Sequence, residues 1–280
     1  MTSALVIKPI SGALGAEIEG VDISRDLDPE TVAGIRQALL DHCVIFFRGQ
    51  NLNVDRHKAF ARLFGLPFLH PYFAGSKTDP EIINIIREPG DTRIVGEYWH
   101  SDTAQMPEPP MGSILYGVEV PPYGGDTLFS NQYLAYESLS SGLKNMLEGR
   151  RGLHSDRLVS GPAQQLNQNR ATKIRIDPDW KETANFHPIF RTHPETGRKA
   201  LYVNRATSVS IEDMTDEESM PLLKYLFDQG SRPEFSCRFR WAPGSVAFWD
   251  NRCTQHIAIN DTGAFRRAMR RIQINGDKPF

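Results

Sequence analysis

Three short segments of this 280-residue chain carry the residue types that chemistry at a metal ion requires. They are Trp-His-Ser-Asp-Thr at residues 99–103, Trp-Asp-Asn-Arg-Cys-Thr-Gln-His at 249–256, and Arg-Arg-Ala-Met-Arg-Arg at 266–271. His100 and Asp102, two positions apart, could join the distant His256 on one face of an iron(II) ion. Two imidazoles and one carboxylate leave the opposite face open for oxygen chemistry. The sequence therefore predicts an iron-dependent oxygenase.

A His-x-Asp pair is a weak signal alone, because a short pattern of common residues recurs by chance in a long chain. It recurs here: His154 and Asp156 fit it, and His-Pro-Glu at 193–195 fits its relaxed form with another carboxylate. The latter segment lies between apolar runs at 186–190 and 200–203, and its proline and following glycine favour a turn. We expect it to be a hairpin loop, and context must choose between the other two pairs.

Iron held by three protein ligands keeps three coordination positions free. A 2-oxo acid could take two of them and oxygen the third. The remote carboxylate of such a co-substrate needs a fixed planar cation, for which arginine is better suited than lysine. Arg267, eleven residues after His256, is the candidate cation, and Thr127 is the candidate hydroxyl donor beside it. From the residues alone, the simpler interpretation of Thr127 is a strand residue that follows a glycine turn.

Arginine clusters are commonly solvated surface or ion-pair networks, but this one lies in a strand-like segment. Met269 and the alternating Ile272 and Ile274 indicate a strand, on which residues two apart share a face. Arg267 and Arg271 would then point the same way. We therefore expect Arg271 to pair with an anionic group of the primary substrate.

Composition and charge limit the kinds of molecule that the protein is expected to bind. The formal net charge is −2 at pH 7 and the basic residues form no long run, so nothing indicates a nucleic-acid or membrane surface, and a small molecule is expected. No apolar run approaches the roughly 18 residues of a membrane span, and no secretory signal is evident, so we expect a cytoplasmic protein. The cysteines at 43, 237 and 253 suit a reducing compartment. Cys253 could be a soft metal ligand, but a core residue is the simpler interpretation.

The elements that must position these residues are mostly short strands. Apolar and β-branched runs bounded by Pro and Gly predict strands at 44–47, 113–120, 127–129, 186–190, 200–203, 235–241, 245–249 and 269–274. Helices are expected to begin at Asp28 and Pro29, to cover 55–64, and to cover 215–230 after a capping box. Many short strands without regular alternation with helices favour a mainly β fold, a jelly roll or β-sandwich with flanking helices.

Taken in order, the motifs resemble those of a known family. His-x-Asp at 100–102 is followed by Gly-Gly-Asp-Thr at 124–127, by the motif at 249–256, and by arginines eleven and fifteen residues beyond its histidine. This order resembles the taurine dioxygenase/2,4-dichlorophenoxyacetate dioxygenase family of iron(II)- and 2-oxoglutarate-dependent enzymes, and the similarity covers nearly the whole chain. It implies a double-stranded β-helix (jelly roll, cupin-like) in a single domain over 1–280 with helical insertions. It also implies a homo-oligomer.

The resemblance assigns roles to the motif residues. It implies His100, Asp102 and His256 as iron ligands, Thr127 and Arg267 as the 2-oxoglutarate clamp, and Arg271 as the position that meets an anionic substrate. It also implies that oxygen splits 2-oxoglutarate into succinate and carbon dioxide while the substrate is hydroxylated. Hydroxylation next to sulfur or oxygen gives an unstable product, so the net result would be cleavage.

The sequence differs from that of taurine dioxygenases at positions expected to contact the substrate. His70 matches a histidine that meets the sulfonate in taurine enzymes, but Phe73, Gly96 and Thr207 stand where those enzymes carry Tyr, Asn and Phe. The segments 93–96, 154–157 and 237–241 are similar to the branch that cleaves aryloxypropionate herbicides. We expect a small organic anion with an apolar body, such as an aryloxyalkanoate, alkyl sulfate or sulfonate. Taurine or a biosynthetic intermediate is the alternative.

Two other classes fit part of the pattern. A cupin-type dioxygenase without an oxo-acid co-substrate would have no use for Thr127 and Arg267 and would form no succinate. A catalytically silent binding protein would hold iron and 2-oxoglutarate weakly or not at all. The second class is disfavoured because every metal and co-substrate position of the family is filled.

Overall fold

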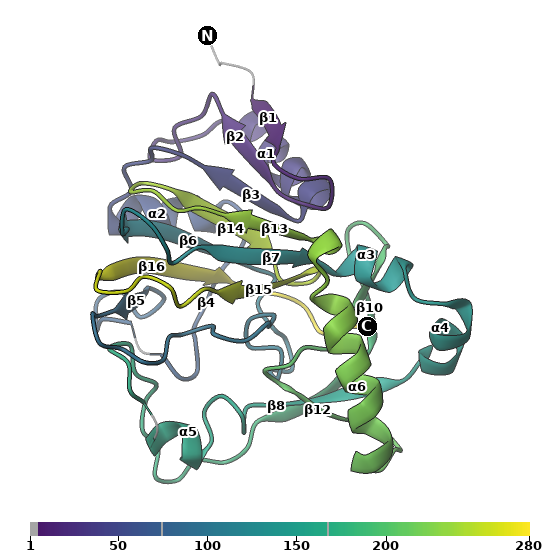
Figure 1. Ribbon diagram of the computed structural model, residues 1–280. Coiled ribbons are helices and arrows are strands. Elements are labelled where there is room, and N and C mark those ends of the chain that lie inside the picture. Colours follow the sequence, from purple (N-terminus) through teal and green to yellow (C-terminus); the bar gives the residue numbers. More distant parts are fainter. Residues whose placement is uncertain (1–4, 74, 167) are drawn as a thin grey trace.

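The strands of the protein form one large sheet and three smaller ones in a computed structural model that describes residues 5–73, 75–166 and 168–280 (Figure 1). The large sheet has the order β1-β2-β3-β14-β6-β16-β4, with β5 also paired to β16. Its strands are β1 (Val6–Pro9), β2 (Ala16–Glu19), β3 (Val44–Phe47), β4 (Pro67–Phe68), β5 (Ile83–Arg87), β6 (Gly112–Glu119), β14 (Val246–Asp250) and β16 (Arg267–Ile274).

The three smaller sheets are antiparallel. One has the order β13-β7-β15 (Ser236–Phe239, Thr127–Asn131 and Thr254–Ala258), and another the order β12-β8-β9 (Ser208–Ile211, Arg151–Ser155 and Ala184–Pro188). The third is the hairpin of β10 (Phe190–Thr192) and β11 (Lys199–Leu201), which confirms the loop expected at 193–197.

The strand expected at 186–190 is two strands. β9 ends at Pro188 and pairs with β8, whereas β10 begins at Phe190 and pairs with β11. Proline has no N–H to donate to a ladder, so it suits the end of β9. The remaining expected strands lie within a few residues of the observed ones, and the strand at 44–47 has the bounds of β3.

One apolar core lies between the large sheet and the β13-β7-β15 sheet. β3 shows the alternation that builds it: Val44 and Phe46 belong to this core, and the Phe46 ring stacks on that of Phe239 with 4.0 Å between centroids. Its other side chains, Ile45 and Phe47, pack with the helices on the outer face of the sheet. Successive side chains of a strand point to opposite faces, so a continuous apolar run fits a strand buried on both sides.

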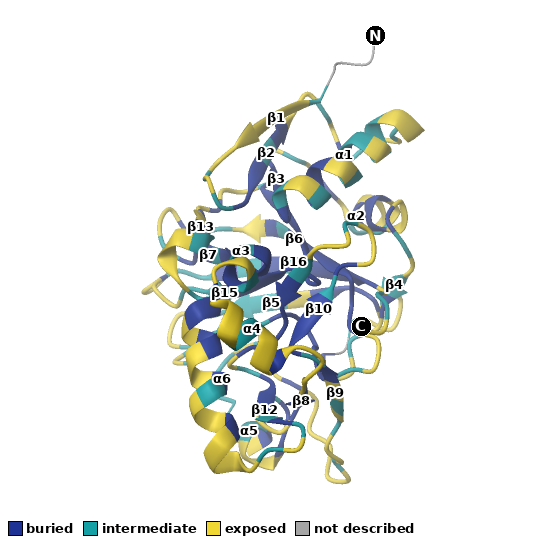
Figure 2. Cartoon of the chain, turned by 90° about the vertical axis from the view of Figure 1, so that its right-hand side faces the viewer, coloured by how far each residue is buried: buried dark blue, intermediate teal, exposed yellow. Residues whose placement is uncertain are grey.

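Helices cover the outer surfaces of these sheets. They are α1 (Pro29–His42), α2 (Val54–Arg62), α3 (Gln132–Glu137), α4 (Ser141–Leu147), α5 (Pro162–Leu166) and α6 (Asp216–Gly230), with a 3-10 turn at Pro233–Phe235. Asp28 caps α1 by accepting from the Thr31 N–H, and Thr215 and Glu218 form the expected capping box of α6. Figure 2 shows α6 buried along one side and exposed along the other. No helix in the described chain is long and apolar enough to cross a membrane.

Candidate active site

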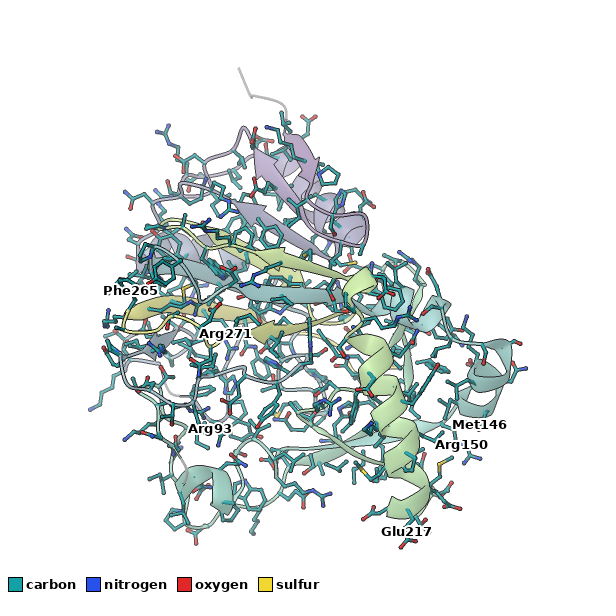
Figure 3. All side chains as sticks on the ribbon, viewed as in Figure 1. Arg93, Met146, Arg150, Glu217, Phe265 and Arg271 are labelled. Atoms are coloured by element: carbon teal, nitrogen blue, oxygen red, sulfur yellow. The ribbon has the colours of Figure 1, made fainter. Side chains whose placement is uncertain are left out.

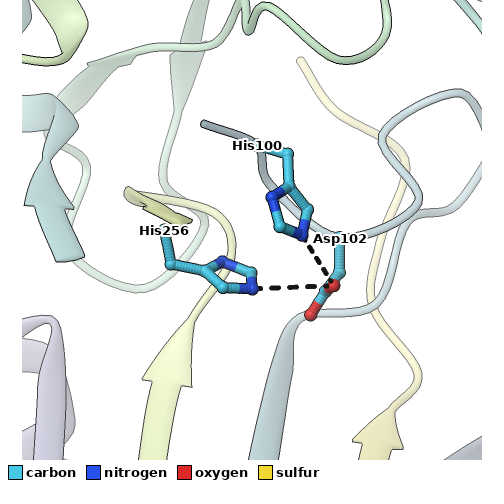
Figure 4. A group of neighbouring side chains, drawn as sticks. All are labelled: His100, Asp102 and His256. Atoms are coloured by element: carbon cyan, nitrogen blue, oxygen red, sulfur yellow. Dashed lines mark ion pairs between the residues drawn. The ribbon is translucent and has the colours of Figure 1, made fainter. Parts of the chain in front are cut away.

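His100, Asp102 and His256 come together although the first and the last are 156 positions apart in the sequence (Figure 4). Asp102 Oδ1 lies 3.6 Å from His100 Nε2 and 3.9 Å from His256 Nε2. One potential ligand atom from each of the three residues lies within 4.8 Å of the others. The geometry thus joins the residues that the sequence motifs single out.

Backbone pairing sets the two imidazoles side by side. The His100 N–H donates to the His256 carbonyl at 3.1 Å, and the His256 N–H donates to the His100 carbonyl at 2.8 Å. His256 lies on β15, whose partner β7 places Phe129 opposite it. The ring of Trp249, 4.6 Å away between centroids, packs on the His256 ring. Main-chain pairing and aromatic packing therefore fix both histidines.

The histidines are arranged to bind a cation through Nε2. The Nδ1 of His100 lies 2.7 Å from the Tyr98 carbonyl, which requires a proton on Nδ1 and leaves a lone pair on Nε2. Burial and the neighbouring His100 lower the pKa of His256 well below its usual value, although Asp102 opposes this. His256 is therefore neutral, as a metal ligand must be.

Asp102 is held by a buried polar cluster. Ser113 Oγ on β6 lies 2.6 Å from Asp102 Oδ2, and the side-chain amides of Gln273 and Asn251 lie 3.2 and 3.4 Å from the same hydroxyl. Both amide nitrogens can only donate, so the serine proton points at the carboxylate. Burial alone would raise the pKa of Asp102, but Arg271 and then the two histidines hold it well below its usual range. The carboxylate is ionised, with Oδ1 facing the histidines.

Arg271 lies closer to the metal-site carboxylate than the sequence suggests. Its Nη1 donates to Asp102 Oδ1 at 3.0 Å, and both side chains are buried. The Nε of Arg271 has no hydrogen-bond partner within the described chain. Arg267 and Arg271 are both buried, and Met269 between them belongs to the core between the sheets, so the expected shared strand face is confirmed.

Arg267 and Thr127 meet at a tryptophan. The guanidinium carbon of Arg267 lies 5.7 Å from the ring centre of Trp241, whose Nε1 donates to Thr127 Oγ1 at 3.0 Å. Arg267 is buried, its Nε has no partner among the described residues, and burial lowers its pKa to about 10. Gly125, at φ +69°, lies so close that a Cβ there would stand 2.9 Å from Arg267 Cδ. Within the described chain, this part of the protein thus holds a buried guanidinium that forms no ion pair, with the Thr127 hydroxyl hydrogen-bonded to the neighbouring Trp241.

A cavity of about 280 Å³ adjoins His100 and Asp102. Its wall includes the sequence-predicted substrate residues His70, Phe73, Gly96 and Arg271, together with Thr207. The described residues that line this cavity do not include Thr127, Arg267 or His256. The sequence-predicted residues therefore form two groups: those that line the cavity with Asp102, and the Thr127–Arg267 pair outside its wall.

His70 presents a neutral donor. Its Nδ1 accepts from the backbone N–H groups of Tyr72 and Phe73 at 3.1 and 3.2 Å, so the ring proton lies on Nε2. Burial and then the charge of Arg271 lower the pKa of His70 to about 3. The ring is therefore uncharged at neutral pH.

The competing pair, His154 and Asp156, is occupied by structural hydrogen bonds. Asp156 accepts from the Tyr72 hydroxyl at 2.8 Å, from Ser160 at 2.8 Å and from a backbone N–H at 3.0 Å. His154 Nδ1 faces the hydroxyl of Thr207 at 3.0 Å. These contacts join the β12-β8-β9 sheet to the cavity wall.

A second group within ligand distance consists of His193, Asp250 and Cys253. Arg252 donates to both carboxylate oxygens of Asp250, at 2.9 and 2.6 Å, and His193 Nε2 lies 3.0 Å from the same carboxylate. The three cysteines are free and buried, and Cys253 packs in the core. This group is a buried ion-pair network in which the guanidinium takes the place of a metal.

Sequence reasoning missed the residues that orient the site. Ser113, Asn251 and Trp241 lie in segments that were recognised as strands or motifs, yet no role in the site was assigned to them. The run at 249–256 offered the signal for Asn251, whose Oδ1 accepts from Trp249 Nε1 at 2.9 Å.

Comparison with known proteins decides the family. The model of the "Taurine catabolism dioxygenase TauD, TfdA family" matches residues 7–273. The chain belongs to the TauD/TfdA family. It is similar to an alkylsulfatase of Acinetobacter baylyi, at 34% identity over 99% of this chain and 86% of the relative. It is also 34% identical to an α-ketoglutarate-dependent sulfate ester dioxygenase of Pseudomonas putida, over 98% of this chain and 91% of the relative.

Solved structures agree with this membership. A crystal structure of a taurine dioxygenase from Burkholderia xenovorans superposes with a TM-score of 0.83 at 41% identity, covering 99% of this chain and 91% of that one. This TauD/TfdA protein is therefore a mainly β enzyme, a dioxygenase dependent on iron(II) and on α-ketoglutarate, here called 2-oxoglutarate, with oxygen as the other co-substrate.

Proposed function

We propose that this enzyme hydroxylates a small organic anion and forms succinate and carbon dioxide in the same reaction. The carbon that is hydroxylated lies beside a group that carries a sulfate, a carboxylate or a sulfonate. The observation that carries the proposal is the convergence of His100, Asp102 and His256 next to a cavity whose wall includes His70 and Arg271. We further propose that the two facing sheets form a double-stranded β-helix in a single domain over 1–280. A homo-oligomer and a cytoplasmic location stay predictions.

The donor set suits iron(II). Two neutral imidazoles and one carboxylate form the facial arrangement that such oxygenases use. His100 would bind through the Nε2 left free by the Tyr98 carbonyl, and Asp102 through Oδ1, which faces both histidines and also accepts from Arg271. Bound iron supplies the activation of oxygen at the expense of 2-oxoglutarate. The protein holds the ligands, keeps Asp102 ionised and places the substrate.

Arg267 suits the remote carboxylate of 2-oxoglutarate. A buried guanidinium without a carboxylate partner gains most from a ligand that supplies one, and its planar fork can bind both oxygens. Thr127 Oγ1 accepts from Trp241, so its own proton is free to donate to the same carboxylate. The hydroxyl and the guanidinium would together clamp one end of the co-substrate.

His70 and Arg271 suit the anionic end of the primary substrate. The Nε2–H of His70 and the N–H groups of Arg271 not used by Asp102 can donate to sulfate or carboxylate oxygens. Phe73 and the aliphatic residues of the wall would cover an apolar body. A side chain at Gly96 would press on His100, since a Cβ there would lie 3.2 Å from its Cε1. Glycine therefore leaves the room beside the metal site free for substrate.

An alkyl sulfate is the substrate class that the relatives favour, because two of them are named as an alkylsulfatase and a sulfate ester dioxygenase. An aryloxyalkanoate would use the same contacts. Hydroxylation of the carbon that carries the ester oxygen would release sulfate and an aldehyde, so one oxygenation accounts for cleavage. Taurine is the second candidate, supported by the similarity to a taurine dioxygenase.

Succinate yield with a panel of substrates tests this proposal. The panel consists of hexyl sulfate, an aryloxypropionate, the neutral amide of that acid, and taurine. We expect the sulfate or the aryloxy acid to exceed taurine, and the amide to be markedly poorer because it leaves Arg271 without an anion. Taurine as the best substrate would overturn the size argument, and equal yields from acid and amide would overturn the role of Arg271.

A further inference from the structure

Four arginines line the cavity, and they differ in whether a carboxylate forms an ion pair with them. Arg93 pairs with Glu97, Arg205 with Asp228 at 2.8 Å, and Arg271 with Asp102 at 3.0 Å. Arg170 is the fourth, and none of the described carboxylates forms an ion pair with it. Its Nη1 donates to the Ile94 carbonyl at 3.3 Å, and its Nε is buried without a hydrogen-bond partner in the described part of the chain.

The position of Arg170 is electrostatically unfavourable without a ligand. Burial and then the charge of Arg93 lower the pKa of Arg170, and Glu97 only partly opposes them. Because Arg93 and Glu97 neutralise each other, this part of the wall carries one net positive charge. Removing a charge from water without pairing it costs free energy. A ligand with a negative group would recover that cost.

Arg170 lies within reach of a substrate held at the metal site. Ile94, to which it is bonded, is two residues from Gly96, and Gly96 lies against His100. Two residues of extended chain span at most about 7 Å. Figure 3 shows Arg93, which precedes Ile94 in the chain, below Arg271 on β16. The carbonyl that Arg170 contacts and the glycine beside His100 are thus at most one short chain length apart.

The cavity wall also carries apolar side chains. They are Phe73, Ile94, Val95, Leu158 and Val159, which line the cavity together with polar residues. A substrate that matches this distribution has an anion near His70 and Arg271, a short hydrocarbon body, and a second acceptor group at the far end.

We propose that Arg170 binds a carboxylate at the end of the substrate remote from the reacting carbon, so that the preferred substrate is a bifunctional acid. The inference rests on the proposed function, since it assumes that the first anion lies near Arg271. The sulfate ester of an ω-hydroxy acid is the class that fits. Arg170 is then a specificity-determining residue, and a plain alkyl chain leaves it unpaired.

Two probes of matched length test the proposal: hexyl sulfate and 6-(sulfooxy)hexanoate. Their dissociation constants are measured by calorimetry on the anaerobic enzyme loaded with iron(II) and 2-oxoglutarate. We expect the carboxylated probe to bind at least about tenfold more tightly to the wild type, as pairing of a partly buried charge predicts. Arg170→Met should abolish this preference and leave hexyl sulfate affinity within about twofold. Arg170→Lys should retain part of it.

Lys173→Met is the matched control, because it removes one positive charge from an exposed position three residues away, outside the cavity wall. It should leave the preference unchanged. Hexyl sulfate binding to Arg170→Met also reports that the variant is folded. Equal affinity of both probes for the wild type, or an equal loss of both in Arg170→Met, would overturn the inference. Failure of the wild type to bind either probe would instead overturn the proposed function and the inference with it.

Discussion

Ser113→Ala should weaken metal binding without removing any ligand. The serine hydroxyl donates to Asp102 Oδ2 at 2.6 Å, and both residues are buried. Without it, Oδ2 has no donor on that side, and the carboxylate can rotate away from the geometry that directs Oδ1 at the histidines. The amides of Gln273 and Asn251 also lose their shared acceptor.

The magnitude follows from the type of hydrogen bond. A bond to a charged group contributes about 1.5 to 3 kcal/mol. Since about 1.4 kcal/mol is tenfold in an equilibrium constant, the metal dissociation constant should rise roughly 10- to 100-fold, as seen when outer partners of metal ligands are removed. The unpaired amides should also lower the free energy of unfolding by about 1 to 3 kcal/mol.

Anaerobic calorimetry with iron(II), repeated with manganese(II), measures the first effect, and urea unfolding measures the second. Ser219→Ala is the matched control: Ser219 is buried in α6 and accepts one backbone hydrogen bond at 3.0 Å, but it contacts none of the site residues. It should change stability alone. Metal affinity within twofold of wild type in Ser113→Ala would refute the role given to this hydroxyl.

Three further predictions concern other parts of the molecule. Arg267→Ala should raise the dissociation constant of 2-oxoglutarate tens- to thousands-fold, a loss of roughly 2 to 5 kcal/mol of binding free energy. Arg267→Lys should recover part of this loss. If titration of Arg267→Ala with 2-oxoglutarate gives the wild-type dissociation constant, the role of Arg267 in the clamp is contradicted. Arg271→Met should remove the preference for an organic acid over its neutral amide in succinate yield, and a preserved preference would argue for another anion site. Burial lowers the pKa of His154 to about 3, against 6.5 unfolded, so the unfolded chain binds more protons between these values. Stability should therefore fall as pH drops from 6.5, by up to about 1.4 kcal/mol per unit, and urea unfolding of His154→Gln at pH 7 and 5 should show a shallower loss.

Elements with strong local signals could be predicted from the sequence. The cap at Asp28, the capping box at Thr215 and the apolar run 44–47 each specify their structure locally, and each lies where expected. β15, at Thr254–Ala258, was missed as a strand because its residues are mostly polar. It is a strand because β7 pairs with it, and such pairing comes from the tertiary fold.

The residues of the site likewise fall into those that local sequence indicates and those that depend on the tertiary fold. The spacing of His100 and Asp102 and the family motif at 249–256 indicated the ligands. The contact between Ser113 and Asp102, and that between Trp241 and Thr127, depend on which strands are neighbours and in which register. A shift of one residue in register would turn these side chains to the opposite face, and a single sequence does not specify that choice. The pairing of Arg271 with Asp102 was missed for the same reason.

The most direct test of the central claim is a count of succinate against product with hexyl sulfate, iron(II), 2-oxoglutarate and oxygen, in the wild type and in Asp102→Ala. The wild type should form one succinate for each sulfate released, since each oxygenation consumes one 2-oxoglutarate. Asp102→Ala should lose both products together, because the carboxylate that completes the metal site is gone. Sulfate release without succinate, or equal turnover by Asp102→Ala, would contradict the account.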